Sequence, residues 1–208
     1  MKPFTQQLVE EGILKSPYII AAFDAIDRAD FVPQALRNHA YKNIPLPIGH
    51  GQTISQPFTV AFMLELLDPR PGQKIMDVGS GSGWQSALLA HITSQEEKQG
   101  VVHAIEVIPE LCEFGKRNIA KYGFIEQGTV KTYCMNAEQG LPDVAPFDRI
   151  IAAASAIKVP EVWKKQLAVG GHMVMPIGWS VILMIKKSET DFQTQEYPGF
   201  AFVPFVLE

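Results

Sequence analysis

Residues 75–90 read Ile-Met-Asp-Val-Gly-Ser-Gly-Ser-Gly-Trp-Gln-Ser-Ala-Leu-Leu-Ala and decide the fold. An apolar run, a glycine-rich segment and a second apolar run predict a buried strand, a turn and a helix. Gly79, Gly81 and Gly83 alternate, so the turn can be tight and a ligand can approach the main chain without meeting a Cβ atom. The helix that follows directs its free N–H groups at that ligand. The stretch therefore predicts a ligand site at a strand-to-helix turn.

The spacing of the glycines distinguishes two classes of ligand. Turns that bind dinucleotides read G-x-G-x-x-G, with the third glycine on the helix. Here Trp84 holds that position and the glycines fall as G-x-G-x-G, which is similar to the turn of S-adenosylmethionine (SAM) methyltransferases. The spacing favours SAM over NAD. An ordinary strand-to-helix turn without a cofactor is the other interpretation.

A second stretch, residues 47–57, reads Pro-Ile-Gly-His-Gly-Gln-Thr-Ile-Ser-Gln-Pro. Neither helical spacing nor strand alternation accounts for it, and such loops often carry function. Together the two stretches resemble the protein-L-isoaspartate O-methyltransferase family, which pairs a G-x-G-Q-T-I-S-x-P loop with a D/E-x-G-x-G-S-G-Y/W-Q turn. The resemblance continues through residues 148–151, 170–171 and 202–206, so it covers nearly the whole chain.

Length and composition indicate one globular unit. The chain has 208 residues, of which 47% are hydrophobic and 19% charged, enough for a full core. The net charge is −4 and no Lys- or Arg-rich run is present, so we expect no nucleic-acid partner. No apolar run is long enough to cross a bilayer, and residues 1–7 lack the apolar core of a signal peptide. We interpret Cys112 and Cys134 as buried thiols in a reducing compartment, and we expect a cytoplasmic monomer.

The order of predicted elements gives the fold class. Residues 5–39 predict helices, and a further helix is expected from Pro57 to Leu67. Strands are then expected at 74–78, 101–107, 129–134, 147–154, 172–176, 181–186 and 201–206, the last two as an antiparallel pair. Helices are expected at 84–92, 109–122 and 160–167, and Gly170-Gly171 is expected to be a turn.

This alternation predicts an α/β fold: a doubly wound, mostly parallel seven-stranded sheet of the Rossmann-like SAM methyltransferase type, with an N-terminal helical extension. We expect residues 1–70 to form the helical region and substrate loop. They should pack on a SAM-binding core of residues 71–208, as one compact unit.

Ligands of such sheets bind at the carboxyl ends of the strands. Glu106 ends the second strand and can accept hydrogen bonds from ribose hydroxyls; a solvated charge is the alternative. Asp77 either orients the N–H groups of the turn or meets the amino end of the cofactor's methionine; a purely turn-stabilising role is the alternative. At residues 136–137 the resemblance implies an acidic residue and a glycine beside adenine, where this chain has Asn-Ala. The expected cofactor contacts are Asp77, Gly79, Ser80, Gly81, Gly83, Glu106, Val107, Asn136 and Ala137.

The resemblance implies a protein-L-isoaspartate(D-aspartate) O-methyltransferase, which uses SAM to methylate the α-carboxylate of L-isoaspartyl residues in damaged proteins. Acceptance of D-aspartyl residues is left open. This carboxylate is ionised at neutral pH and needs no general base, so catalysis is alignment and partial removal of water. Ser55 is the expected catalytic residue, holding one carboxylate oxygen; a helix cap before Pro57 is the alternative. The expected substrate contacts are Thr53, Ile54, Ser55, Ala153 and Ala154.

Two other functions stay open: a methyltransferase of this fold with a different carboxylate acceptor, and a SAM-binding module without turnover. His50 is expected to face solvent. Trp84 is expected to be core or pocket wall, with a position near the sulfonium as the alternative. No metal is expected, because the five histidines lack ligand spacing with acids or cysteines.

Overall fold

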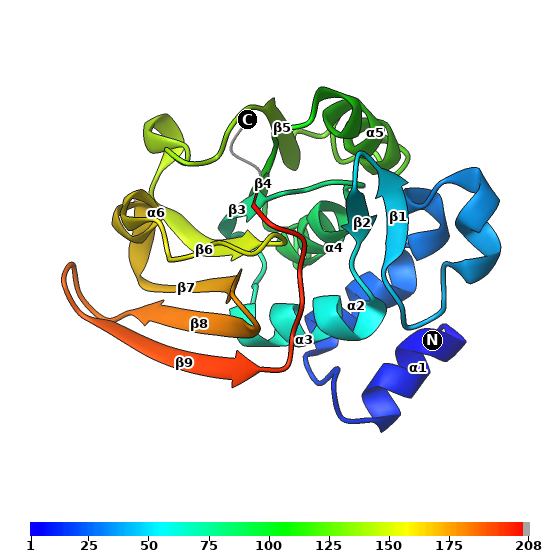
Figure 1. The fold of residues 1–208 in the computed structure, drawn as a ribbon, viewed down its shortest axis with the longest axis horizontal. Helices are drawn as coiled ribbons and strands as arrows, with labels where there is room; N and C mark the ends of the chain where they lie inside the picture. Colours follow the sequence, from blue (N-terminus) through cyan, green and yellow to red (C-terminus); the bar gives the residue numbers. More distant parts are fainter. Residues whose placement is uncertain (206–208) are drawn as a thin grey trace.

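The computed structural model describes residues 1–205. Within them, one seven-stranded sheet has the order β5-β4-β3-β6-β7-β8-β9 (Figure 1). The central strands β3 (Lys74–Val78), β4 (Val101–Glu106), β5 (Val130–Cys134), β6 (Phe147–Ala152) and β7 (Leu167–Ile177) run parallel. At one edge, β8 (Ser180–Lys186) pairs antiparallel with both β7 and β9 (Phe192–Pro198). The predicted mostly parallel seven-stranded sheet is confirmed.

Both faces of this sheet are apolar, because successive strand residues point to opposite sides. Ile75, Ile151 and Val174 belong to one buried cluster, whereas their neighbours Met76 and Ile150 belong to the other. The first cluster is covered by α2 (Pro17–Ala25), α3 (Pro57–Leu67), α4 (Trp84–Thr93) and α5 (Pro109–Ala120). The second is covered by α6 (Glu161–Gln166), the turn η3 (Pro142–Val144) and irregular chain. Helices therefore lie on both faces, with less helix on the second.

The N-terminal region forms a helical extension, as predicted. It comprises α1 (Pro3–Glu10), α2 and the short 3₁₀ segments η1 (Arg28–Phe31) and η2 (Gln34–His39). Proline stands at the start of α1, α2 and α3, where its missing N–H has no helical partner to lose. Phe23 of α2 packs edge-on against Trp84 of α4, with ring centroids 5.5 Å apart. The extension thus shares its core with the helix that follows the glycine turn.

Three local predictions are wrong. The segment expected as an irregular loop forms a hairpin of β1 (Leu46–Gly49) and β2 (Gln52–Ile54). Gly170-Gly171 lies inside β7, at an irregularity in its pairing with β6, rather than in a turn. The last strand is β9 rather than residues 201–206, since residues 201–205 make one isolated bridge, from Pro204 to Ser155; Val206 lies outside the described residues. The sequence pattern did not indicate β9, because this edge strand faces solvent and consists mostly of polar residues.

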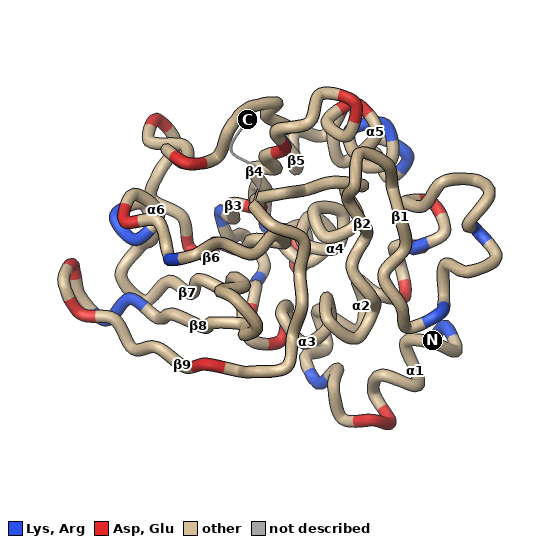
Figure 2. Tube along the Cα trace, in the orientation of Figure 1, with Lys and Arg blue, Asp and Glu red and all other residues tan. Residues whose placement is uncertain are grey.

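Charged residues are scattered over the molecule but are absent from two segments near one another. Figure 2 shows that the β1–β2 hairpin and residues 199–205, the described chain after β9, carry no Lys, Arg, Asp or Glu. In Figure 1 the chain after β9 runs, in red, back past the tip of β6. No helix among residues 1–205 combines the length and apolar character needed to span a bilayer.

Candidate functional site

The glycine turn between β3 and α4 is held by main-chain contacts on two sides. The N–H groups of Gly79 and Ser80 donate to the carbonyl of Ile105 in β4, at 2.9 and 3.0 Å. Gly83 has a φ of +86°, and a Cβ there would stand 2.8 Å from the carbonyl oxygen of Gly115 in α5. The turn is therefore pinned to β4 and lies against α5, with room for glycine only at its last position.

Asp77 lies beneath this turn and is fully buried. Its carboxylate accepts hydrogen bonds from Gln85 Nε2 at 2.7 Å and Ser86 Oγ at 2.5 Å, both on the first turn of α4. Burial raises the pKa of Asp77 to about 6, and the charge of Glu106 acts in the same direction, against the two hydrogen bonds. The observed contacts tie β3 to α4, which is the turn-stabilising role.

We expect Asp77→Asn to stabilise the fold near neutral pH. Because burial raises the native pKa of Asp77 above its ordinary value, the charged form destabilises the native state above about pH 6. The charged carboxylate destabilises the native state by about 2 to 3 kcal/mol, and this destabilisation disappears as the pH falls toward 4. The amide can still meet Gln85 and the Ser86 hydroxyl. Thermal unfolding from pH 4 to 8 should show that Asp77→Asn is more stable than wild type by an amount that grows with pH. The exposed control Asp143→Asn should show no such gain in stability. A gain independent of pH would contradict this cause.

Glu106 lies at the edge of a cavity above the turn. Its carboxylate accepts N–H groups from Gly81 at 2.9 Å, Val107 at 2.9 Å and Ile108 at 3.1 Å. It is therefore a buried, ordered group rather than a solvated charge. Five of the predicted cofactor residues line this cavity: Gly79, Gly81, Glu106, Val107 and Ala137. Ser80 lines a smaller adjacent cavity.

The segment after β5 contributes to the cavity differently from the sequence expectation. Asn136 Oδ1 accepts the N–H of Glu138 at 2.7 Å, and Asn136 is not among the residues that line the cavity. Met135 lines it instead, together with Ala137, whose carbonyl accepts Trp163 Nε1–H at 2.8 Å. The contact of Asn136 with adenine stays a prediction, and no sequence pattern marked Met135.

Ser55 follows the β1–β2 hairpin and lines a second, open cleft of about 710 Å³. The cap of α3 is Gln56, so the cap role considered for Ser55 is wrong. Phe58, at the start of α3, and Phe200, after β9, stack at 6.5 Å between ring centroids and line the same cleft. Ser55 thus belongs to a groove of largely apolar walls.

The cofactor cavity and the cleft share three lining residues: Thr53 of β2, Ala153, just after β6, and Val203. Thr53 and Ala153 also line the smaller cavity. Ile54 lines that smaller cavity, and Ala154 lines the cofactor cavity. All five predicted substrate residues therefore gather where the two spaces join.

Sequence reasoning missed the role of the chain after β9 in this site. Val203, Pro204 and Phe205 line the cofactor cavity. They are held by Ser155, whose N–H donates to Val203 O and whose carbonyl accepts from Phe205 N, both at 2.9 Å. The resemblance in residues 202–206 was the available signal, but it was interpreted as an edge strand.

His50, Trp84 and the two cysteines lie in three different environments. His50 is exposed at the tip of the hairpin with a φ of +53°, which fits its solvent-facing interpretation. Trp84 is 1% exposed and packs in the core. The expectation of two buried thiols is wrong, because Cys112 of α5 and Cys134 of β5 form a disulfide and Cys134 is exposed. The packing of α5 beside the end of β5 joins them, which their separation in sequence does not reveal. Within residues 1–205, no group of three or more His, Cys, Asp or Glu side chains forms a metal site.

Comparisons with known proteins agree with this arrangement. The family profile described as protein-L-isoaspartate(D-aspartate) O-methyltransferase matches residues 2–208. Protein-L-isoaspartate O-methyltransferases of Aeropyrum pernix and Staphylothermus marinus are 44% and 41% identical, over 98% and 95% of this chain and 78% and 89% of theirs. A Plasmodium falciparum structure, described as this enzyme with S-adenosyl-L-homocysteine, shares the fold with a TM-score of 0.88 and 24% identity, over 99% of this chain and 97% of that chain. The chain belongs to the protein-L-isoaspartate(D-aspartate) O-methyltransferase family.

Proposed function

We propose that this protein uses SAM to methylate the free α-carboxylate of L-isoaspartyl residues in damaged proteins. The observation that carries the proposal is that the cavity above the glycine turn and the Ser55 cleft share the lining residues Thr53, Ala153 and Val203. A methyl donor in the cavity and a carboxylate in the cleft would be neighbours at these residues. The names of the family's relatives support the same substrate.

The residues present fit a nucleoside cofactor. The Glu106 carboxylate accepts three main-chain N–H groups and, with about four acceptor positions, has capacity left for a ribose hydroxyl. Ile108, Met135 and Ala137 offer apolar walls suited to a purine ring. When bound, SAM supplies a methyl group on a positively charged sulfur. Ala153, whose side chain is small, lines both the cavity and the cleft and would leave room there for an acceptor to approach that methyl group.

The chain's own contribution to the reaction is alignment. An isoaspartyl α-carboxylate is ionised at neutral pH, so it would need no general base to accept the methyl group that bound SAM would supply. The Ser55 hydroxyl donates to one carboxylate oxygen while the other attacks, and the apolar cleft walls remove water around it. The methyl ester then loses methanol when the neighbouring amide nitrogen closes a succinimide, whose hydrolysis returns some aspartate.

The direct test uses labelled SAM and two peptides that differ only in aspartyl or isoaspartyl linkage. We expect label on the isoaspartyl peptide alone. Label on neither peptide, with stabilisation of the protein by SAM, would favour another acceptor or a binding module and overturn the proposal. A D-aspartyl peptide in the same assay tests the wider acceptor range.

We expect Glu106→Gln to weaken SAM binding by about tenfold or more. The substituted amide group would place an N–H donor against the N–H groups that the carboxylate now accepts, which disorders the ribose contact. Titration calorimetry with SAM measures the change. Glu110→Gln, an exposed neighbour on α5, is the control. Equal affinities of Glu106→Gln and wild type would remove Glu106 from the cofactor site.

The proposal also covers the division of the chain, the oligomeric state and the location in the cell. Residues 1–70, a helical region with the substrate loop, pack on a SAM-binding core that begins at residue 71, and the two form one compact unit. The protein acts as a monomer, which size-exclusion chromatography tests. We also propose a cytoplasmic location, which cell fractionation tests. The two cysteines do not support this location, because they form a disulfide rather than the separate thiols expected in a reducing compartment.

A further inference from the structure

Arg28 lies beside the Ser55 loop as a buried cation without an acidic partner. Its side chain is fully buried, and no carboxylate among residues 1–205 lies within ion-pair distance. Removing an unpaired charge from water is strongly unfavourable, so the surrounding protein has to compensate it.

Main-chain oxygens provide this compensation, and two of them belong to the acceptor loop. The guanidinium donates to the carbonyls of Ala40 at 2.6 Å and Ile44 at 3.2 Å. It also donates to Ser55 O at 2.9 Å and Ile54 O at 3.4 Å. The charge therefore rests against the main chain of the residue whose hydroxyl lines the cleft.

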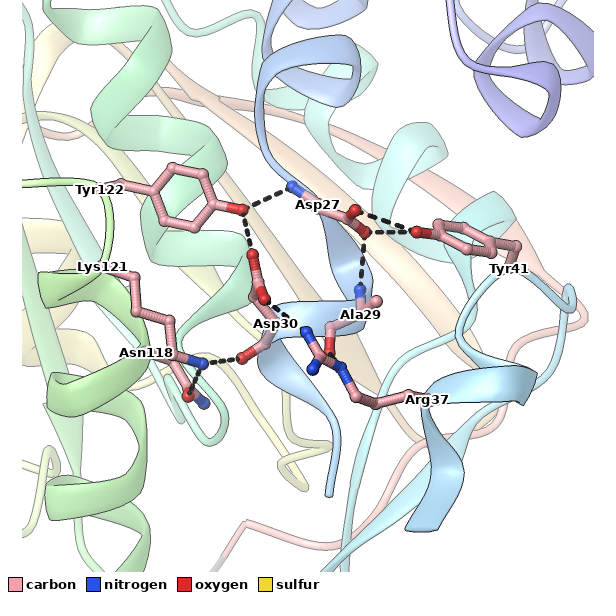
Figure 3. A network of polar contacts seen from close by, with 8 residues as sticks. All are labelled: Asp27, Ala29, Asp30, Arg37, Tyr41, Asn118, Lys121 and Tyr122. Atoms are coloured by element: carbon pink, nitrogen blue, oxygen red, sulfur yellow. Dashed lines mark hydrogen bonds and ion pairs between the residues drawn. The ribbon is translucent and has the colours of Figure 1, made fainter. Parts of the chain in front are cut away.

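The segment that carries Arg28 is firmly anchored, as Figure 3 shows. Asp27 accepts from the hydroxyl of Tyr41, and Asp30 accepts from the hydroxyl of Tyr122. The main-chain N–H of Asp27 also donates to Tyr122 Oη at 2.8 Å, which ties η1 to the chain after α5. Both neighbouring carboxylates are thus engaged away from the Arg28 guanidinium.

The guanidinium also contacts α4. It lies over the Trp84 ring, 5.3 Å from the centroid, at the first residue of the helix that follows the glycine turn. One rigid cation therefore touches both the acceptor loop and α4.

The cleft itself offers an anion no charged side chain. Most of its lining comes from residues 55–59 and 198–203, and Figure 2 shows no Lys or Arg on either segment. Its described lining is uncharged: Pro45, Thr53, Ser55, Gln56, Phe58, Thr59, Ala153, Pro198, Gly199, Phe200, Ala201, Phe202 and Val203. Any protein charge that attracts a carboxylate into this cleft has to act from behind the lining.

We propose that Arg28 is the positioning residue that selects an anionic acceptor, attracting its carboxylate to the Ser55 hydroxyl through the buried charge behind the Ser55 carbonyl. The inference rests on the proposed function. Arg28 does not touch the acceptor; it acts across one residue of main chain, where little water or salt screens the attraction. The same contacts fix the Ser55 loop.

The wild-type protein provides the first test. Binding of two peptides is compared in the presence of S-adenosylhomocysteine, which lacks the sulfonium charge: one with an isoaspartyl α-carboxylate, the other with the neutral α-carboxamide. We expect the acid to bind about tenfold more tightly, with a ratio that stays constant from about 0.05 M to about 0.5 M NaCl. Equal affinities, or a ratio that salt abolishes, would overturn the proposal, because exposed charges or none would then be responsible.

Variants provide the second test. Arg28→Met is expected to reduce the acid-to-amide ratio about tenfold, whereas Arg28→Lys, which keeps the charge, retains most of it. Arg37→Met, the same exchange at a half-exposed arginine that pairs with Asp30, is the control and keeps the wild-type ratio. A merely structural role would weaken both peptides equally and leave the ratio unchanged, which overturns the inference. If Arg28→Met does not fold, the proposal is judged on the acid-to-amide ratio of the wild-type protein and on the salt dependence of that ratio.

This outcome is distinguishable from failure of the proposed function. If the wild-type protein methylates the isoaspartyl peptide and Arg28→Met keeps the acid-to-amide ratio, only the proposed role of Arg28 is wrong. If the wild-type protein methylates no isoaspartyl peptide, both the proposed function and the role of Arg28 are wrong.

Discussion

Replacing Ser55 with alanine is expected to lower turnover of an isoaspartyl peptide by about 10- to 100-fold and to leave SAM affinity nearly unchanged. A hydrogen bond to a charged group contributes about 1.5 to 3 kcal/mol, which sets this range. Ser55 lines the acceptor cleft and the small cavity beside it, but not the cavity that holds Glu106. The loss should therefore fall on the acceptor step.

The measurement is initial-rate kinetics with labelled SAM, combined with calorimetric titration of SAM alone. Ser55→Thr keeps a hydroxyl and should retain more activity than Ser55→Ala. Ser188→Ala, an exposed serine in the β8–β9 turn, is the control for the exchange itself. Unchanged turnover in Ser55→Ala, or loss of SAM binding, would remove Ser55 from its proposed role.

Gly83→Ala is expected to destabilise the fold by about 3 to 5 kcal/mol and to abolish SAM binding. Its φ of +86° disfavours any side chain, and the added Cβ would stand 2.8 Å from both Gly115 O and Ile119 Cγ1. Relief requires α5 to move away from the glycine turn. Since α5 begins directly after the cavity residues Glu106, Val107 and Ile108, the cofactor site moves with it.

Gly128→Ala is the matched control for this prediction. Gly128 has a similar φ of +73°, but an added Cβ meets nothing within 4 Å. Gly128→Ala should lower the free energy of unfolding by about 1 kcal/mol, which corresponds to a fall in Tm of about 3 °C. The expected fall for Gly83→Ala is about 10 °C. Equal losses in the two variants would show that α5 does not press on the turn.

The parts of the site that follow from local spacing could be predicted from the sequence. Alternating glycines between a buried strand and a helix mark a tight ligand turn at Gly79 and Gly81, wherever it occurs. Parallel strands bring their carboxyl ends to one edge, which placed Glu106 beside that turn. The Ser55 loop was recognised by resemblance, although its hairpin form was missed.

The rest depended on long-range packing. Arg28 stands in a segment whose pattern indicates only helix, and its contacts with Ser55 O and Ala40 O arise when the extension folds onto the hairpin. The approach of Phe205 to the cofactor cavity depends on its main-chain contact with Ser155. The pairing of Cys112 with Cys134 depends on how α5 lies beside β5. No local period encodes such contacts.

The central claim is that a SAM-type cofactor lies over the glycine turn and that Ser55 holds the acceptor carboxylate against its methyl group. A crystal structure with S-adenosylhomocysteine and an isoaspartyl peptide measures this directly. We expect the ribose at Glu106, the sulfur near Thr53 and Ala153, and Ser55 Oγ within hydrogen-bond distance of the α-carboxylate. A cofactor bound elsewhere, or a Ser55 side chain turned away from the sulfur, would contradict the claim.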